Sequence, residues 1–383
     1  MNRLINAGWD PGRLNNKLYL SDKKIINMNV ICSGYERRVL EQEDGELVNF
    51  LDVEVYRGDE YLGRYFVGGM AYKHHRGDLR WTANGIPKFD DASNDEAIKI
   101  VTHLALSQFD PNDLKKKVYF RLGTGSPTEE YFNNTDILRK FAEMMKIPYR
   151  VVFKHPLFKG AIIEVSIPKM YFKPEGTASL ISMTHDDNLT RRKEIGDIFE
   201  RGYKIIGMNI GSSTTDVAII KPDMTFESSG FFGIDVGTSN ALNLIRSELY
   251  KEYGYDIPKV KVDFMIRKYK KVSYKGQIID LEDIKRRPFE NMLALLKTKF
   301  FDQLEMKGID PGEAGAICIS GGAVMLIGEK LENFIPGVAT QISLNPLFED
   351  ARGYYLEAKI NELIEDRVEN EIFTDVEEIV EVE

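Results

Sequence analysis

Residues 209–220, NIGSSTTDVAII, carry small hydroxyl side chains between two apolar runs. The apolar residues predict a hairpin of buried strands, whose turn would need only Asn-Gly or Asp-Gly. Turn N–H groups and hydroxyls can instead donate hydrogen bonds to phosphate oxygens, and a glycine lets a ligand approach the backbone. We therefore expect a phosphate-binding turn here. Its expected ligands are Gly211, Ser212, Ser213, Thr214, Thr215 and Asp216.

A second stretch, DPGRLNNKLYLS at residues 10–21, aligns with the first from about half a chain length away. Asp10 then matches Asn209, and Lys17 adds a positive charge near the turn. Two such hairpins that face each other across a cleft would enclose a triphosphate, with Asp10 holding a magnesium ion through water. The expected ligands of this turn are Gly12, Arg13, Leu14, Asn15, Asn16 and Lys17.

A third stretch, ICISGGAVM at residues 317–325, predicts a buried strand, a glycine turn and the start of a helix. Glycines here would let an adenine ring or an α-phosphate lie against the backbone, and a helix N-terminus favours anions. Taken alone, this stretch also fits an ordinary strand-to-helix turn. Its expected nucleotide ligands are Gly321, Gly322 and Ala323.

Composition limits the class of protein. The chain has 383 residues and a net charge of −9, which argues against direct binding of nucleic acid. Cys32 and Cys318 are its only cysteines, as suits a reducing cytoplasm. The first ten residues are too polar for a signal peptide, and no apolar run is long enough to cross a bilayer. We expect a cytoplasmic protein that does not bind a membrane.

The order of predicted elements indicates an α/β protein. Strands are followed by helices twice over, which favours two similar domains. We expect domain I at 1–183 and domain II at 184–350, with a polar, charged bridge at 184–203 as the boundary. A final helix at 351–367 is expected to pack back on domain I, followed by an acidic tail at 368–383. Hydrophobic periodicity predicts further helices at 94–109, 135–146, 239–254 and 288–308.

These three motifs, in this order, resemble those of the actin, heat-shock ATPase and sugar kinase superfamily. Within it, KPEGTASL at 173–180 and NPLFEDARGYYLEAK at 345–359 look like the bacterial actin-like proteins of the plasmid-segregating ParM type. The resemblance implies two ribonuclease H-like domains with ATP, or GTP, and Mg²⁺ in the cleft between them. It also implies head-to-tail filaments, plasmid DNA as cargo and a DNA-binding adaptor protein as partner.

The resemblance also implies roles for single residues. By position, Glu175 matches the residue that orients the attacking water, and Asp10 is expected as the second catalytic acid. The alternative for Glu175 is an acidic residue that is favoured there only by the dipole of a helix start. Arg267 and Lys268 lie where the family contacts ribose and adenine. The second phosphate loop usually opens with Asp, whereas this chain has Asn209, so we expect only a weak metal contact there. Ser320 replaces a third glycine of the adenosine motif.

The alternative function is a small-molecule kinase of the same superfamily. Such an enzyme needs a carboxylate base near an acceptor hydroxyl, and the sequence shows no clear second acidic motif. A chaperone ATPase would need a peptide-binding module after residue 383, and a membrane-tethered scaffold would need a basic C-terminal helix where this chain is acidic.

Overall fold

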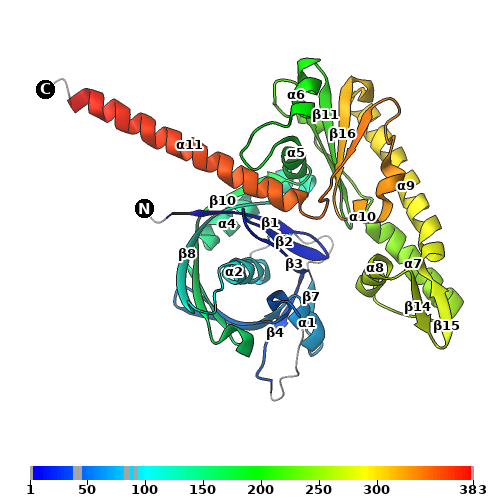
Figure 1. The fold of residues 1–383 in the computed structure, drawn as a ribbon, viewed down its shortest axis with the longest axis horizontal. Helices are drawn as coiled ribbons and strands as arrows, with labels where there is room; N and C mark the ends of the chain where they lie inside the picture. The colour runs from blue at the N-terminus through cyan, green and yellow to red at the C-terminus, as the bar shows by residue number, and fades with distance from the viewer. Residues whose placement is uncertain (1–2, 38–44, 82–86, 90–93, 381–383) are drawn as a thin grey trace.

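The chain folds into two lobes that lie side by side, with a long helix leaving their junction (Figure 1). The structure is a computed structural model that describes residues 3–37, 45–81, 87–89 and 94–380, with side chains described as far as residue 367. We call the part built on the larger sheet lobe I and the part built on the smaller sheet lobe II. No helix of the described residues is long and apolar enough to span a membrane.

The larger sheet curls around helix α2 (Asp95–Ser107), whose residues are nearly all buried (Figure 1). Its strand order is β3-β2-β1-β8-β10-β9-β5-β6-β4-β7. The strands are β1 (Ile5–Pro11), β2 (Asn15–Tyr19), β3 (Lys24–Met28), β4 (Val30–Ser33), β5 (Leu51–Arg57), β6 (Glu60–Val67), β7 (Arg80–Trp81), β8 (Lys115–Ser126), β9 (Tyr149–Phe153) and β10 (Ile162–Pro174). The remaining helices of this region are α1 (Gly69–His74), α3 (Thr128–Asn133) and α4 (Thr135–Met145).

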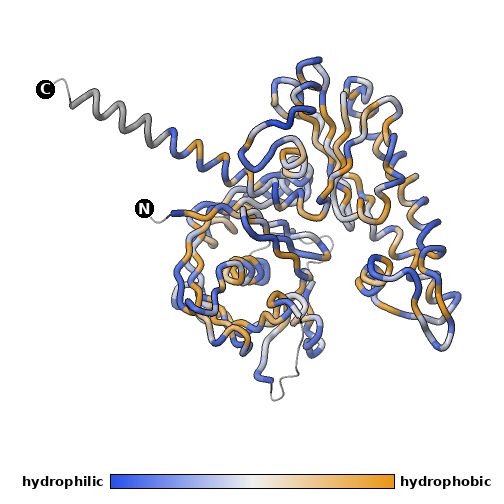
Figure 2. Tube along the Cα trace, in the orientation of Figure 1, coloured by the Kyte–Doolittle hydropathy of each residue, from blue (hydrophilic) through white to orange (hydrophobic). Residues whose placement is uncertain are grey.

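The smaller sheet has the strand order β13-β12-β11-β16-β17 and is covered by helices on both faces. Its strands are β11 (Lys204–Ile210), β12 (Thr215–Ile220), β13 (Phe232–Ile234), β16 (Ala314–Ser320) and β17 (Ala339–Ile342). A separate hairpin is formed by β14 (Lys271–Tyr274) and β15 (Gln277–Asp280). The helices are α5 (Thr177–Thr184), α6 (Lys193–Glu200), α7 (Thr238–Tyr253), α8 (Lys259–Lys268), α9 (Leu281–Met306) and α10 (Val324–Ile327). Figure 2 shows apolar residues gathered on the strands of both sheets.

The two sheets share one topology. The run β3-β2-β1-β8-β10 has the same order and the same strand directions as β13-β12-β11-β16-β17. In the first, Asp10 pairs across the hairpin with Lys17. In the second, Asn209 pairs with Asp216. The two hairpins aligned from the sequence therefore occupy equivalent places in the two lobes.

Helix α11 (Glu349–Val380) joins the lobes. Its first turns pack against β1, β8 and α5, and its far end extends beyond lobe I (Figure 1). The contact with α5 is so close that a Cβ atom at Gly353 would lie 1.9 Å from the backbone oxygen of Ala178. Only glycine fits there. This packing fixes the start of α11 beside the ends of β1 and β11.

Three segments differ from the sequence expectations. The helix expected from residue 288 begins at Leu281, because the Asp280 side chain caps it by accepting a hydrogen bond from the backbone N–H of Glu282. Pro288, the expected first residue, lies inside this helix. The bridge at 184–203 contains α6, whose Ile195 and Phe199 pack on the smaller sheet. Residues 368–380 continue α11, whereas the sequence predicted a separate tail.

Candidate nucleotide site between the lobes

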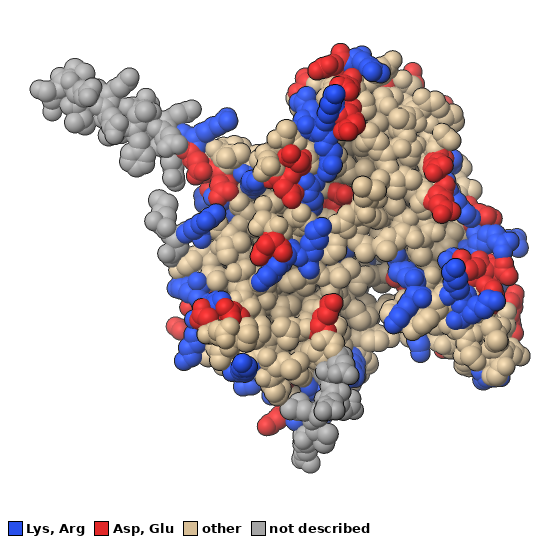
Figure 3. Space-filling view, viewed as in Figure 1, with Lys and Arg blue, Asp and Glu red and all other residues tan. Residues whose placement is uncertain are grey.

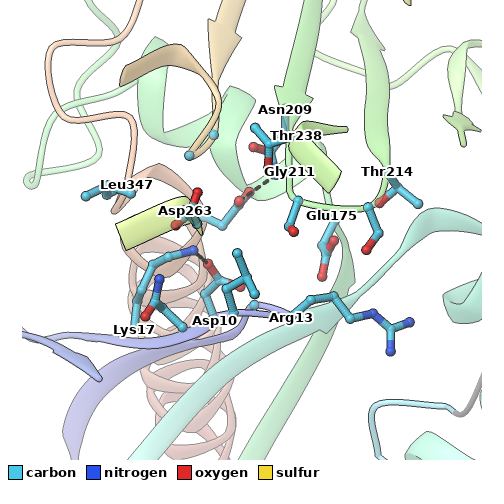
Figure 4. A pocket seen from close by; sticks show the side chains of 18 of the residues that line it. Asp10, Arg13, Lys17, Glu175, Asn209, Gly211, Thr214, Thr238, Asp263 and Leu347 are labelled. Carbon is cyan, nitrogen blue, oxygen red and sulfur yellow. Dashed lines mark hydrogen bonds and ion pairs between the residues drawn. The ribbon is translucent and has the colours of Figure 1, made fainter. Parts of the chain in front are cut away.

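One cavity lies between the lobes and has a volume of about 230 Å³. On the face shown in Figure 3, the surface is hollowed where the lobes meet, and acidic and basic side chains are interspersed around it. In Figure 4, side chains from both lobes, among them Asp10, Glu175 and Asn209, reach into this space. The sequence-predicted residues that line it are Asp10, Gly12, Arg13, Leu14, Asn15, Lys17, Glu175, Asn209, Gly211, Ser212, Ser213, Thr214, Arg267, Gly321 and Gly322.

The other predicted ligands lie outside the cavity lining. Asn16, Thr215 and Ala323 are fully buried, and the Thr215 hydroxyl donates to the backbone oxygen of Val236 at 2.8 Å. Asp216 is buried and accepts from the backbone N–H at the start of α3 at 3.0 Å, which ties lobe II to lobe I. The Lys268 ammonium lies 5.2 and 5.5 Å from two aromatic ring centroids on the surface of α8 and the residue after it.

The first hairpin brings charge to the cavity. The Lys17 ammonium donates to the Asp10 carboxylate at 2.5 Å, as their cross-strand pairing dictates. Asp10 is only 3% exposed, so this ion pair is largely shielded from water. The amide of Asn29, which lies between β3 and β4, donates to the backbone oxygen of Gly12 at 2.7 Å and supports the turn.

The second hairpin is fixed by its own backbone and by α7. The N–H of Gly211 donates to the oxygen of Thr214 at 2.9 Å, which closes the turn. The N–H groups of Thr238 and Ser239, at the start of α7, donate to the carbonyls of Gly211 and Ser212 at 3.2 and 2.7 Å. The carbonyls therefore face α7, and the Thr238 hydroxyl, buried without a partner, lies at the cavity lining.

The glycine turn after β16 requires glycine at its first position. Gly321 has φ of +96°, and a Cβ there would lie 2.3 Å from the oxygen of Ile210. The Arg267 guanidinium donates to the oxygen of Gly322 at 3.0 Å and pairs with Asp263 at 2.9 Å. Arg267 therefore connects α8 to this turn at the edge of the cavity.

Glu175 follows the last residue of β10 and is 8% exposed. Its carboxylate forms an ion pair with the ammonium of Lys88, a cavity residue that sequence reasoning missed. Burial raises the pKa of Glu175 to about 7, although Lys88 opposes the rise. Burial by itself would lower the pKa of Lys88, but the negative charges of Glu175 and Asp10 raise it. Lys88 stands in no recognisable motif, so no sequence signal marked it.

A second missed residue, Asp350, lies beside Asn209. The Asn209 amide donates to the Asp350 carboxylate at 2.6 Å, and both residues line the cavity. Burial raises the pKa of Asp350 well above its ordinary value, and the charges of Asp10 and Glu175 add to the rise. From sequence, Asp350 is an acid at the start of a helix, where the dipole alone explains it. Asp350 therefore brings a carboxylate beside Asn209 that comes from neither phosphate loop.

The remaining missed residues complete the wall of the cavity. Ile26, Met325 and Leu347 provide apolar surface, which suits one face of a flat ring. Pro127, Thr238 and Asp263 come from both lobes. Met325 stands within the glycine motif, but Ile26 and Leu347 reach the cavity only through the folding of the chain.

The cavity fits Mg²⁺ through its oxygen atoms. Asp10, Asn209 and Asp350 offer the carboxylate and amide oxygens that this hard ion prefers. One side-chain oxygen each of Asn209 and Asp350 is buried without a hydrogen-bond partner. Within the described residues, no three His, Cys, Asp or Glu side chains converge closely enough to hold a metal by themselves. An ion would therefore need phosphate oxygens and water to complete its coordination.

The chain has the fold of actin-like proteins. An archaeal actin homologue, Ta0583, matches it with a TM-score of 0.70 at 19% identity, over 94% of this chain and 100% of that one. A ParM in a filament from Clostridium botulinum matches with a TM-score of 0.71 at 20% identity, over 93% and 99% of the two chains. ParM of Bacillus thuringiensis, solved with AMPPNP, gives a TM-score of 0.70 at 16% identity, over 94% and 99%.

A family model supports the same conclusion by sequence. Residues 208–333 match the model of the archaeal actin homologue MreB-like family, C-terminal part. This range begins in the second hairpin and extends past the glycine turn. A comparison with curated proteins gave no match. The resemblance to actin-like proteins predicted from the motifs is thus confirmed, as is an α/β fold of two actin-type domains.

Proposed function

We propose that this protein binds ATP, or GTP, together with Mg²⁺ in the cavity between its lobes and hydrolyses it. The observation that supports this most is the meeting of three glycine turns at one cavity, two of them on topologically equivalent hairpins. Lys17, Lys88 and Arg267 add positive charge at the same cavity. Among the structural relatives, Ta0583 was solved in complex with ADP and B. thuringiensis ParM with AMPPNP.

In the proposed reaction, Glu175 accepts a hydrogen bond from a water molecule and orients it toward the γ-phosphorus. An oxygen–phosphorus bond forms from the water, the bond from the γ-phosphorus to its bridging oxygen breaks, and the water proton passes to the carboxylate. A carboxyl group with a pKa near 7 can take up and return this proton at neutral pH. Lys88 holds the carboxylate in place. Mg²⁺, when bound, would screen the charge of the phosphates.

We further propose that nucleotide binding drives head-to-tail assembly into filaments. Support comes from the fold and from the C. botulinum ParM, whose filament structure gives a TM-score of 0.71. Movement of plasmid DNA through a DNA-binding adaptor protein is the finer part of this proposal, and it comes from the likeness to ParM alone. That part is tested by measuring how often dividing cells lose a reporter plasmid that carries the gene for this protein, compared with the same plasmid without the gene. The plasmid with the gene should be lost less often.

Sedimentation and electron microscopy of purified protein test the main proposal. With ATP and Mg²⁺ the wild type should pellet and show filaments, whereas protein without nucleotide should stay in the supernatant. Glu175→Ala should still bind nucleotide and polymerise but release phosphate more slowly, so that its filaments last longer. A wild type that remains monomeric with ATP and Mg²⁺ at high protein concentration overturns filament formation. Unchanged phosphate release by Glu175→Ala removes Glu175 from its role.

A small-molecule kinase is the second candidate. A cavity of about 540 Å³ adjoins the first, because Pro127 and Thr214 line both, and it carries the carboxylates of Glu129, Asp216, Asp235 and Asp302. Such a polar space next to the expected γ-phosphate could hold an acceptor. Incubation with labelled ATP and a panel of sugars separates the two functions. Label found only in inorganic phosphate supports the filament ATPase, and label transferred to a sugar supports the kinase.

A further inference from the structure

The contact between Asn209 and Asp350 crosses the junction of the lobes. Asn209 stands near the end of β11 in lobe II, whereas Asp350 is the second residue of α11, which packs on the sheet of lobe I. The hydrogen bond between them is 2.6 Å long and is drawn as a dashed line at Asn209 in Figure 4. Their exposed fractions are 5% and 7%, and each keeps one oxygen without a hydrogen-bond partner.

Asp350 differs from the other carboxylates of the cavity lining in how its charge is balanced. The others each have a cationic partner: Asp10 pairs with Lys17, Glu175 with Lys88, and Asp263 with Arg267. Among the described residues, the side chain of Asp350 is hydrogen-bonded only to the neutral amide of Asn209. The nearby Lys17 ammonium lowers the pKa of Asp350 but is already paired with Asp10, so Asp350 has no ion-pair partner of its own among the described residues, which is unfavourable for a buried carboxylate. A cation in the cavity would supply the missing charge.

We propose that Asp350 is a cation-positioning residue that provides, beside Asn209, the second carboxylate of the divalent-cation site to which Asp10 belongs. The cation is held through water molecules and nucleotide phosphates. Asn209 contributes a neutral oxygen and orients Asp350 through its amide. This inference rests on the proposed function, because the cation is expected together with nucleotide. It also means that the carboxylate absent at position 209 is supplied by a helix that begins 140 residues later.

A helix dipole offers a competing reason for an acid at position 350. Glu349 occupies the same helix start, but its carboxylate faces away from the cavity and is hydrogen-bonded to the hydroxyls of Ser182 and Ser343. Loss of the negative charge at either residue should reduce the stability of the helix start by a similar amount. Only loss at Asp350 should affect the cation. Glu349→Gln is therefore a matched control.

The test measures cation affinity directly, with Mn²⁺ as a paramagnetic probe titrated into protein saturated with ADP and followed by electron paramagnetic resonance. The variants are Asp350→Asn, Glu349→Gln, and the exchange Asn209→Asp with Asp350→Asn. Asp350→Asn should weaken Mn²⁺ binding about tenfold, the order expected when one elementary charge is lost at water-mediated distance. The exchange restores one carboxylate and one amide in reversed places, so it should return the affinity to within about twofold of wild type. Glu349→Gln should match wild type.

A second measurement separates this inference from the proposed function. Binding of a fluorescent ADP analogue is followed by anisotropy in excess chelator, where no divalent cation is available. Wild type and Asp350→Asn should bind it with similar affinity, since Asp350 acts through the cation. If wild type binds nucleotide and Asp350→Asn binds Mn²⁺ as wild type does, the inference is wrong while the proposed function stands. If wild type binds no nucleotide either in chelator or with Mg²⁺ present, both are wrong. An exchange variant that folds, by circular dichroism, but does not recover Mn²⁺ affinity also overturns the inference.

Discussion

Lys88 and Glu175 form a buried ion pair at the cavity between the lobes, although 87 residues separate them in the sequence. Lys88 is held by its backbone N–H, which donates to the Glu130 carboxylate at 2.6 Å. The backbone N–H of Glu175 donates to Ser126 at 2.8 Å. The carboxylate proposed to orient the attacking water is thus positioned by a cation from a separate segment of lobe I. This arrangement leads to the first two predictions.

Replacement of Lys88 by Met should slow phosphate release. Lys88 lowers the pKa of Glu175, so its loss leaves burial and the neighbouring carboxylates unopposed and the pKa of Glu175 rises further. The carboxylate is then scarcer at pH 7, and we expect release to fall on the order of tenfold. Single-turnover phosphate release measures this. Lys173→Met is the control, because Lys173 lies on β10 just before Glu175 but pairs with Glu357 at 3.2 Å. An equal loss in both variants would contradict a specific role for Lys88.

Phosphate release by the wild type should increase with pH and level off above the pKa of Glu175. Burial raises that pKa from 4.5 to about 7; the charges of Asp216 and Asp10 raise it and that of Lys88 lowers it. Only the ionised form accepts a hydrogen bond from water through both oxygens. Below pH 7 most Glu175 is therefore protonated and inactive. A pH series of single-turnover rates should show this inflection, and Glu175→Gln should remove it. An inflection that persists in Glu175→Gln belongs to another group.

The hairpins and the glycine turn were predictable because their chemistry is local. The turn residues are consecutive in sequence, and equivalent hairpins could be aligned through Asp10 and Asn209. Lys88 and Asp350 could not be found in this way, because each reaches the cavity through packing between segments far apart in the chain. Turn residues such as Asn16 and Thr215 could not be separated from the lining residues, since strand pleat decides which side chains face the cavity. The sequence predicted the fold and left these tertiary contacts open.

Gly321→Ala should destabilise the protein and weaken nucleotide binding, whereas Gly322→Ala should be tolerated. Alanine at position 321 must adopt φ of +96°, and its Cβ would lie 2.3 Å from a backbone oxygen. We expect a loss of about 1–3 kcal/mol in the free energy of unfolding. At Gly322 the nearest atom, in the Leu347 side chain, is 3.7 Å from the new Cβ. Chemical denaturation of both variants checks this, and equal stabilities would refute the assigned strain.

One added methyl group where α11 crosses α5 should destabilise the protein as much as alanine at position 321 does. In Gly353→Ala the new Cβ would lie 1.9 Å from the Ala178 oxygen, so the helices must separate, at about 1–3 kcal/mol. Gly196→Ala in α6 is the matched comparison, because no atom lies within 4 Å of its new Cβ. Alanine favours a helix over glycine by about 1 kcal/mol, so this variant should be more stable than wild type. Thermal unfolding should therefore shift in opposite directions; a stabilised Gly353→Ala would show that the helices are less tightly packed.

Arg267 and Lys268 should differ in their effect on nucleotide affinity, although both were expected at the nucleotide. Arg267 lines the cavity, donates to Gly322 and neutralises Asp263, whereas Lys268 lies outside the lining. In Arg267→Ala the Asp263 carboxylate loses its counter-ion and repels the nucleotide phosphates. At water-mediated distance this repulsion should cost about 1 kcal/mol of binding free energy, which raises the Kd of the nucleotide roughly fivefold.

Anisotropy of a fluorescent ATP analogue measures these affinities. Salt should reduce the loss, because it screens the repulsion between Asp263 and the phosphates. Lys268→Ala should bind as wild type does. The double variant Asp263→Asn with Arg267→Ala separates the two effects of Arg267, since it removes the repelling carboxylate as well. If that variant recovers most of the affinity, the main role of Arg267 is to neutralise Asp263. If it binds as weakly as Arg267→Ala, the guanidinium acts through the Gly322 turn or the nucleotide itself. Equal losses in Arg267→Ala and Lys268→Ala would contradict the placement of the two side chains.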